Sequence, residues 1–265
     1  MYKIKKIWLM GGFGNVLFQV LAFNVLSKKN KNIFFIKILT QKNIITKFFG
    51  WTIHQELYSE LIDNKQFKKV HTFKAFIILL VSFYSKKFKR KVKIATFYDH
   101  DNQIDDEISE NIFGYFQDKY FLKQNQKDLL DLGGTVGAKY RLEKSFPIVV
   151  HYRKGDSAWA TKFSYYYDEI KRLLQNESLP ILIVSDSIDD ANFFFKDVKN
   201  IKILSSNNAI DDFKYLVSAD KLYCAPSTFS WWASHSLNNK AELIMPKFLD
   251  EYLGVYVDRQ YLTII

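Results

Sequence analysis

The stretch Val149–Asp156 (VVHYRKGD) joins a short apolar run to a charged turn. An apolar run bounded by Pro147 and Gly155 is typical of a parallel strand that is covered on both faces. Ligands of open α/β sheets bind beyond the carboxyl ends of such strands, and an arginine there is well suited to hold a phosphate. The stretch favours a ligand-binding strand end, and an ordinary solvated turn is the alternative. The flanking sequence decides between the two.

Strand and helix patterns alternate regularly after this point. The expected strands are Pro147–Tyr152, Ile181–Val184, Ile201–Leu204, Lys221–Ala225 and, as the last one, Ala241–Met245; the expected helices are Ser164–Gln175, Asp189–Phe195, Ile210–Val217 and Thr228–Leu237. Strands that alternate with helices at this spacing form βαβ crossovers. This half of the chain therefore predicts a parallel, doubly wound sheet.

A second βαβ pattern opens the chain. Lys6–Met10 is an expected strand, Gly11–Asn15 (GGFGN) leads into a helix that ends near Ser27, and Asn32–Leu39 is the next strand. The turn lacks the third glycine of the dinucleotide fingerprint, and no acidic residue ends the second strand, which disfavours an NAD site. Either the glycines let a ligand approach the backbone, with Asn15 offering its amide, or they serve only a tight turn.

Two α/β domains are expected, because 265 residues allow each half of the chain a core of its own. Asp131–Phe146 contains three glycines and precedes Pro147, so it is predicted to be the linker between them. The predicted domains are residues 1–140 and 141–265.

The composition limits the classes of partner and cofactor. A formal net charge of +10 implies nucleic acid, an anionic membrane face or a phosphorylated substrate. The single cysteine, Cys224, lies in an apolar run and predicts a buried residue in a reducing compartment. No Cys/His cluster has zinc spacing, so no structural metal is expected. Asp99–Asp101 (DHD) is either a base or metal site or a group of solvated loop residues.

The longest apolar run, Ala75–Tyr84, is followed at once by the basic run Lys86–Lys93. The apolar run is much shorter than the ~20 residues that a spanning helix needs. Two interpretations are open. The segment is either a buried element with a solvated exit, or an interfacial segment that places its apolar side in lipid and its cations against anionic head groups.

Three strand ends in the second half carry polar groups suited to a nucleotide: Arg153, Asp186 and Pro226–Ser230. A cation and a hydroxyl-rich helix N-terminus can together hold a pyrophosphate. Asp186 can accept a hydrogen bond from a ribose hydroxyl or from the donor edge of a guanine. The alternatives are that Ser227 only caps its helix and that Asp186 is a solvated turn carboxylate.

Five motifs, in order along the chain, resemble those of family 11 glycosyltransferases, the α-1,2-fucosyltransferases. They are Gly11–Asn15 with Leu17–Gln19 (family GG-x-GN-x-LFQ), Gly114–Gln117 with Lys119–Phe121 (GYFQ-x-x-KYF), His151–Asp156 (H-x-RRGD), Ser185–Asp186 (SD) and Ser227–Ala233 (STFSWW followed by Ala). The resemblance extends over nearly the whole chain, and together the motifs are highly specific.

The resemblance implies a GT-B architecture of two facing α/β domains, with the donor held mainly by the second. It implies inverting transfer of L-fucose from GDP-β-L-fucose to an acceptor glycan, with no obligatory metal, no further cofactor and no nucleic acid partner. The acceptor can be lipid-linked, as in bacterial O-antigen synthesis. The implied location is the cytoplasm, at the inner face of the inner membrane. Under the interfacial interpretation given above, Lys86–Lys93 would be a peripheral contact to anionic lipid there.

The resemblance also implies a role for each site residue. Arg153 pairs with the β-phosphate, His151 positions the pyrophosphate, Asp186 contacts guanosine, Ser227, Thr228 and Ser230 donate to phosphate, and Asn15 reaches the phosphate or glycosidic oxygen from the other domain. Gly12, Gly14 and Phe229 complete the implied donor-binding set. Asp156 is the candidate base, with a capping role as its alternative and the departing pyrophosphate as another acceptor for the proton.

Departures from the family pattern concern the acceptor and the sugar. Lys154 replaces the second arginine of the RRGD motif and loses its planar fork. Val16 stands where the family has Gln, and Val20 where it has Tyr. Transfer of another GDP-linked deoxy sugar such as colitose is therefore an alternative. Two further alternatives are an enzyme that uses a UDP-sugar and a basic module that binds lipid or nucleic acid without catalysis.

Overall fold

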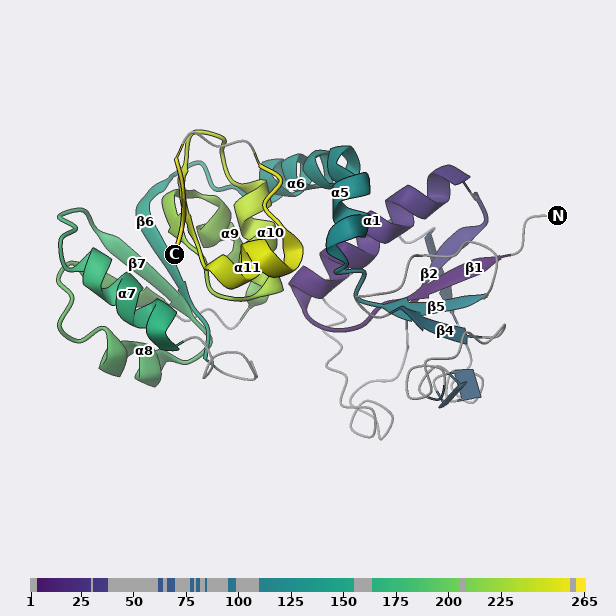
Figure 1. Ribbon diagram of the computed structural model, residues 1–265, viewed down its shortest axis with the longest axis horizontal. Helices are drawn as coiled ribbons and strands as arrows, with labels where there is room; N and C mark the ends of the chain where they lie inside the picture. Colours follow the sequence, from purple (N-terminus) through teal and green to yellow (C-terminus); the bar gives the residue numbers. More distant parts are fainter. Residues whose placement is uncertain are drawn as a thin grey trace. The chain divides into compact units, whose positions relative to one another are not determined.

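Two α/β units, each built on a parallel sheet, make up the chain (Figure 1). They comprise Met1–Leu129 and Leu130–Ile265. The computed structural model describes residues 4–29, 31–37, 62–63, 66–69, 77–78, 80–81, 84, 95–98, 110–154, 164–204, 208–257 and 261–265. The predicted fold class, α/β with parallel sheets, is confirmed.

The first unit has a five-stranded sheet with the order β3-β2-β1-β5-β4, in which every pair is parallel. Its elements are β1 (Lys5–Trp8), α1 (Phe13–Lys29), β2 (Ile33–Lys37), β3 (Phe67–Lys69), β4 (Ala95–Tyr98), β5 (Asn111–Gly114) and α5 (Lys119–Gln124). The predicted opening βαβ pattern is confirmed as β1, α1 and β2. Because β1 lies between β2 and β5, the loops after β1 and β5 leave the same edge of the sheet on neighbouring strands.

Helix α1 is buried on nearly all sides. Its buried residues include Leu17, Phe18, Leu21 and the polar Gln19, and it ends in Lys28 and Lys29. A helix with apolar residues all round is a core element rather than a surface element. Lys28 and Lys29 stabilise the end of α1, because positive charges interact favourably with the C-terminal end of the helix dipole.

The second unit has a six-stranded parallel sheet with the order β11-β10-β9-β6-β7-β8. Its elements are β6 (Phe146–Tyr152), α7 (Ser164–Leu174), β7 (Ile181–Ser185), α8 (Ile188–Phe194), β8 (Ile201–Leu204), α9 (Ala209–Val217), β9 (Ala219–Tyr223), α10 (Thr228–Ser236), β10 (Glu242–Met245), α11 (Lys247–Leu253) and β11 (Leu262–Ile264). This is the strand order of the doubly wound dinucleotide-binding fold, with β6 as its first strand and β9 as its fourth. The predicted alternation is confirmed.

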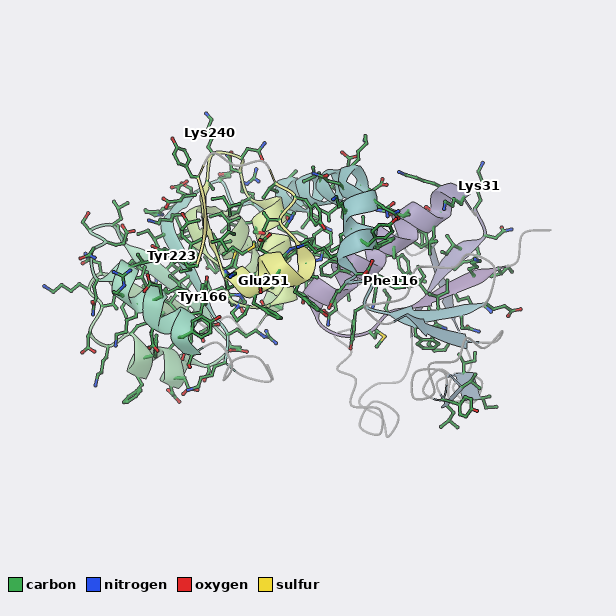
Figure 2. The ribbon with its side chains drawn as sticks, in the orientation of Figure 1. Lys31, Phe116, Tyr166, Tyr223, Lys240 and Glu251 are labelled. Atoms are coloured by element: carbon green, nitrogen blue, oxygen red, sulfur yellow. The ribbon has the colours of Figure 1, made fainter. Side chains whose placement is uncertain are left out.

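One hydrophobic cluster of the second unit lies between the sheet and helices α7 and α8. The central strand β6 is buried from Ile148 to Tyr152, as the uninterrupted apolar pattern predicts for a strand covered on both faces. Tyr166 and Tyr223 lie in this cluster (Figure 2). Each fully buried Ile, Val or Leu side chain in this cluster stabilises the fold by about 1.5–3 kcal/mol relative to an exposed one.

The prediction that Ala241–Met245 is the last strand is wrong. Helix α11 and strand β11 follow it, and β11 pairs with β10 at the edge of the sheet. Strand β11 has only three residues and is largely exposed, so it has no buried apolar pattern that would predict it.

The segment Asp131–Phe146, predicted to be the linker between the domains, is helical over most of its length. Helix α6 (Gln126–Tyr140) includes all three glycines, and the division between the two units falls inside it. A Cβ atom on Gly133 would lie 2.4 Å from the carbonyl oxygen of His235, and one on Gly137 would lie 2.2 Å from that of Ser236. These glycines therefore let α6 pack directly on the backbone of α10.

None of the described helices is both long enough and apolar enough to span a membrane.

Candidate functional site

The switch point of the second sheet lies between β6 and β9, the neighbouring strands where the strand order reverses. In doubly wound sheets, ligands bind in the crevice beyond the carboxyl ends of these two strands. His151 and Arg153 lie at the end of β6, and Ser227–Ser230 follows β9. The structure thus brings two segments that the sequence separates by more than seventy residues to the same edge of the sheet.

A hydrogen bond joins the two segments. His151 and Ser230 are both buried, and His151 Nδ1 lies 2.5 Å from Ser230 Oγ. Ser230 Oγ also accepts a hydrogen bond of 2.9 Å from the backbone N–H of Ala225. A hydroxyl oxygen accepts up to two hydrogen bonds and donates one, so both ring tautomers of His151 fit these two contacts.

Burial and the adjacent positive charge of Arg153 lower the pKa of His151 from 6.5 to about 3. Desolvation penalises the charged imidazolium, and a nearby cation penalises it further. His151 is therefore neutral at physiological pH and offers an N–H group rather than a charge.

The start of α10 presents the second part of the site. Ser227 Oγ caps the helix by accepting a hydrogen bond of 3.2 Å from the Ser230 N–H. This bond leaves the hydroxyl proton of Ser227 to be donated to a ligand. Thr228 is half-buried, and the half-buried Phe229 ring packs on His151 with 5.4 Å between ring centroids. A helix start of this kind attracts anions.

Ser230 has a different role from the direct phosphate contact that the family resemblance implies. Its side chain is fully buried, and its hydroxyl is engaged by His151 and Ala225. Ser227, Thr228 and the helix N–H groups are therefore the candidate anion-binding groups at this end of α10.

Arg153 supplies the cation of the site. Its backbone N–H donates to the Tyr167 hydroxyl, and the same hydroxyl donates to the Arg153 carbonyl, each over 3.1 Å. Burial raises the pKa of the Tyr167 phenol, which therefore stays neutral and can both donate and accept. Tyr167 comes from α7 and fixes the backbone from which the arginine side chain extends. Sequence reasoning missed it, because a tyrosine on a helix with an apolar face reads as an ordinary core residue.

Asp186, after β7, contacts the same turn. One of its carboxylate oxygens accepts a hydrogen bond of 3.0 Å from the backbone N–H of Lys154, and the other lies 3.8 Å from Arg153 Nη1. The carboxylate orders the turn after β6 and lies beside the arginine. Guanosine recognition by Asp186 remains an expectation of the resemblance.

Lys154 is directed toward α8. Its ammonium group lies 2.7 Å from Asp190, and Asp190 also accepts a hydrogen bond of 2.6 Å from the Ser187 hydroxyl. The lysine that replaces the second arginine of the family motif is thus paired with a carboxylate of the neighbouring helix.

The first unit has a similar junction at its own switch point, which lies between β1 and β5. Gln19 is fully buried; its amide exchanges two hydrogen bonds of 3.1 Å with the backbone of Met10 and donates another of 3.1 Å to the Gly114 carbonyl. It thereby joins the ends of the two strands. Gly11 has φ +82°, a conformation that favours glycine.

Asn15 lies in the first turn of α1 and contacts the loop after β5. Its Oδ1 accepts a hydrogen bond of 2.7 Å from Gln117 Nε2, and a Cβ atom on Gly11 would lie 2.5 Å from its Nδ2. The side chain is fixed between the two motif segments with its NH₂ group toward the glycine turn. Gly14 is buried in the helix, whereas a Cβ on Gly12 would meet nothing within 4 Å. The backbone at Gly12 is therefore open to close approach.

Several expected groups lie outside the described residues: Asp156, Lys86–Lys93 and Asp99–Asp101. Within the described ranges, no group of three or more His, Cys, Asp and Glu side chains is placed to hold a metal ion. Cys224 is buried, as expected.

Together, the second unit places an arginine, a neutral imidazole N–H and a hydroxyl-rich helix start at one switch point. Such a set can hold a diphosphate by charge, by backbone N–H groups and by neutral donors. It can also stabilise negative charge that develops on a departing diphosphate.

Similar solved structures include three glycosyltransferases. The E. coli heptosyltransferase WaaC with ADP has a TM-score of 0.51 and 9% identity, with 98% of this chain and 92% of that chain covered. The α-1,6-fucosyltransferase NodZ co-crystallised with GDP, known from Bradyrhizobium, has a TM-score of 0.42 and 9% identity, with 89% and 93% covered. Acinetobacter baumannii MurG has a TM-score of 0.38 and 14% identity, with 99% and 86% covered.

No protein-family model matches the sequence, and no curated protein matches it at a significant level. The similarity to WaaC over nearly the whole chain, together with the two parallel sheets, defines the fold class: the chain has the GT-B fold of glycosyltransferases.

Proposed function

We propose that the protein is a glycosyltransferase of the family 11 type that transfers L-fucose from GDP-β-L-fucose to a hydroxyl of an acceptor glycan, with an α-1,2 linkage. The observation that carries the proposal is the junction of the H-x-R-K-G-D and S-T-F-S motif segments through His151 and Ser230. Two segments that resemble one family's motifs meet at the switch point, where this fold binds nucleotides. The neighbour with the same fold, WaaC, was solved with ADP.

The proposed reaction is a single displacement with inversion at the anomeric carbon. The acceptor oxygen forms a bond to C1 of the sugar, the bond from C1 to the β-phosphate oxygen breaks, and its electron pair leaves with GDP. Arg153 and the helix start at Ser227 stabilise the charge on the leaving group. The acceptor proton passes to Asp156 or to the departing diphosphate. No metal or further cofactor is required in this scheme.

A panel of nucleotides and nucleotide sugars tests which nucleobase and which sugar the donor carries. GDP is expected to raise the melting temperature more than UDP or ADP at equal concentration. Incubation with GDP-fucose, GDP-colitose and UDP-sugars, each with candidate acceptors, followed by NMR of the product, identifies the sugar and linkage. Stabilisation by UDP over GDP, or product from a UDP-sugar alone, contradicts the proposed donor class.

A non-enzymatic basic module is the competing class, and the net charge of +10 is the observation behind it. It predicts binding to DNA, RNA or anionic vesicles that weakens steeply with salt, and no response to GDP. The same thermal-shift panel separates the classes, because only a donor-binding enzyme responds selectively to one nucleotide.

A membrane contact is proposed as part of this function. Ile77, Leu80 and Tyr84 are helical residues spaced along one face, with 45%, 41% and 46% of their surface exposed, while Ile78 is buried. The sequence next to them, Lys86–Lys93, contributes six cations. An apolar face beside a basic run suits anionic lipid and a lipid-linked acceptor at the cytoplasmic face of a bacterial inner membrane, as in O-antigen synthesis.

Vesicle co-sedimentation tests this contact. Binding is expected with vesicles that contain phosphatidylglycerol, and is expected to fall with salt and in Leu80→Ser. Phe193→Ser is the matched control, since Phe193 is 75% exposed on α8 in the second unit. Equal binding to neutral and anionic vesicles, or an equal loss in both variants, contradicts the proposal.

A further inference from the structure

We infer that Ser230 is a positioning residue that fixes His151 in the Nε2–H tautomer, so that His151 acts as a neutral hydrogen-bond donor to the bound diphosphate sugar and not as a proton acceptor. The inference rests on the proposed function. It assigns a role to a buried pair that lies behind the surface of the donor site.

The first step is the direction of the hydrogen bonds at Ser230. The Ala225 N–H donates to one lone pair of Ser230 Oγ over 2.9 Å, and the serine itself lies on the first turn of α10, held by its own N–H to Ser227 Oγ. Among the contacts of Ser230 Oγ with the described residues, His151 Nδ1 is the one that can accept the hydroxyl proton, since the Ala225 N–H can only donate. A protonated Nδ1 would instead leave this buried hydroxyl proton without an acceptor among those contacts, and buried polar groups in proteins are nearly always hydrogen-bonded.

The second step is the consequence for the imidazole. With Nδ1 occupied as an acceptor, the ring proton resides on Nε2. A nitrogen that carries a proton cannot take one from an acceptor hydroxyl. His151 is thus unsuited to be the general base that a histidine at such a site would suggest. The low pKa of His151 agrees with this, because a buried neutral ring resists further protonation.

The third step is the location of the ring. It lies at the carboxyl end of β6, two residues before Arg153, with the Phe229 ring packed against it. Phe229 limits the tilt of the imidazole, and Ser230 sets its proton. A neutral N–H donor beside a cation suits an oxygen of a diphosphate or of the sugar, since the imidazole adds a directed hydrogen bond without adding charge.

NMR of the full-length protein labelled with ¹⁵N-histidine tests the tautomer directly. The His151 signals are assigned from the spectrum of His151→Asn. Two-bond ¹H–¹⁵N correlations at pH 7 are expected to show an unprotonated Nδ1 and a protonated Nε2. A protonated Nδ1 in the unsubstituted protein overturns the inference, whether or not GDP binds.

Substitution of Ser230 tests the consequence for binding. Ser230→Ala is expected to lose the single-tautomer signature and to weaken GDP binding by about tenfold. Ser230→Cys, which keeps a weak donor, is expected to restore part of both. The matched control is Ser234→Ala, a fully buried serine of the same helix whose hydroxyl donates to the Trp231 carbonyl over 2.7 Å.

The two readouts separate the inference from the proposed function. If Ser230→Ala keeps both the tautomer and the GDP affinity of the unsubstituted protein, Ser230 is not a positioning residue. If the unsubstituted protein shows the Nε2–H tautomer but does not respond to GDP, the proposed function fails while the tautomer assignment stands. Equal losses of GDP affinity in Ser230→Ala and Ser234→Ala indicate a merely structural effect and also overturn the inference.

Discussion

The Tyr167 hydroxyl both accepts from the backbone N–H of Arg153 and donates to its carbonyl, over 3.1 Å in each direction. A side chain of α7 thus satisfies both backbone groups of the residue that carries the cation of the site. A turn held this way presents its side chain from a fixed point, which reduces the ordering cost when a ligand binds.

Tyr167→Phe is expected to lower the free energy of unfolding by about 1 kcal/mol, the usual cost of a lost hydrogen bond, and to weaken GDP binding several-fold. Isothermal titration and urea unfolding measure the two effects. Tyr165→Phe, an exposed tyrosine of the same helix, is the control and should change neither. GDP affinity that is unchanged in Tyr167→Phe would show that the turn does not need this anchor.

Arg153→Ala is expected to reduce sugar transfer by about 1000-fold, because the side chain neutralises charge that develops on the leaving diphosphate. The fold should persist, since the side chain is only partly buried and its 3.8 Å pair with Asp186 is worth at most about 1 kcal/mol. Arg153→Lys should fall between the two, because it keeps the charge but loses the planar fork. Arg172→Ala, an exposed arginine of α7 paired with Glu169, is the control. Normal turnover in Arg153→Ala contradicts the proposed mechanism.

Gln117→Ala is expected to lower the rate of transfer about tenfold and the free energy of unfolding by about 1 kcal/mol, because the buried side chain loses a hydrogen bond. Gln117 donates to Asn15 Oδ1 over 2.7 Å and so fixes which end of the Asn15 amide faces the glycine turn. Without it the amide can turn over, and its NH₂ group is no longer held in place. Steady-state kinetics check the effect, with the exposed Gln124→Ala as control. A rate equal to that of the control would exclude a role for the Asn15 orientation.

The α6 glycines give opposite expectations for the same substitution. Gly133→Ala should lower the free energy of unfolding by about 1–3 kcal/mol, because its Cβ would collide with the His235 carbonyl. Gly134→Ala, with nothing within 4 Å of its Cβ, should raise it by about 0.5–1 kcal/mol, since alanine favours a helix. Thermal unfolding of the two variants measures the difference. A destabilised Gly134→Ala would contradict the helical packing of α6.

As the pH decreases below about 6.5, the free energy of unfolding should decrease, in part because of His151. Burial and Arg153 lower the pKa of this imidazole to about 3 in the folded protein, from 6.5. The unfolded chain therefore binds a proton between these values that the folded protein does not bind. The stability that the neutral His151 imidazole contributes above pH 6.5 is therefore lost as the pH falls toward 3, by up to about 1.4 kcal/mol per pH unit.

Urea unfolding of the unsubstituted protein and of His151→Asn, between pH 4.5 and 7.5, isolates this contribution. The difference in free energy of unfolding between the two proteins should shrink as the pH falls. A difference that stays constant over this range would mean that His151 is not held neutral by the fold.

The sequence by itself determined the architecture of the second unit. The buried run Val149–Tyr152 and the strands and helices after it follow the local apolar pattern closely, and the structure confirms them as β6 to β10. Local pattern suffices here because a strand covered on both faces must be apolar throughout. It failed for β11, which is short and exposed, and for α6, whose glycines serve a packing contact with α10 that no local pattern records.

Only the tertiary structure decided the roles of the individual site residues. The motifs predicted His151 and Ser230 to be members of one site, but the hydrogen bond from which we infer the positioning role of Ser230 joins positions 79 residues apart. The contact between Gln117 and Asn15 spans 102 residues, and Tyr167 contacts Arg153 from a different element. A sequence specifies which polar groups exist and where the chain turns. The packing of distant elements decides which of these groups are buried and which partners they bind, because a buried polar group bonds to the partner that the fold brings within reach.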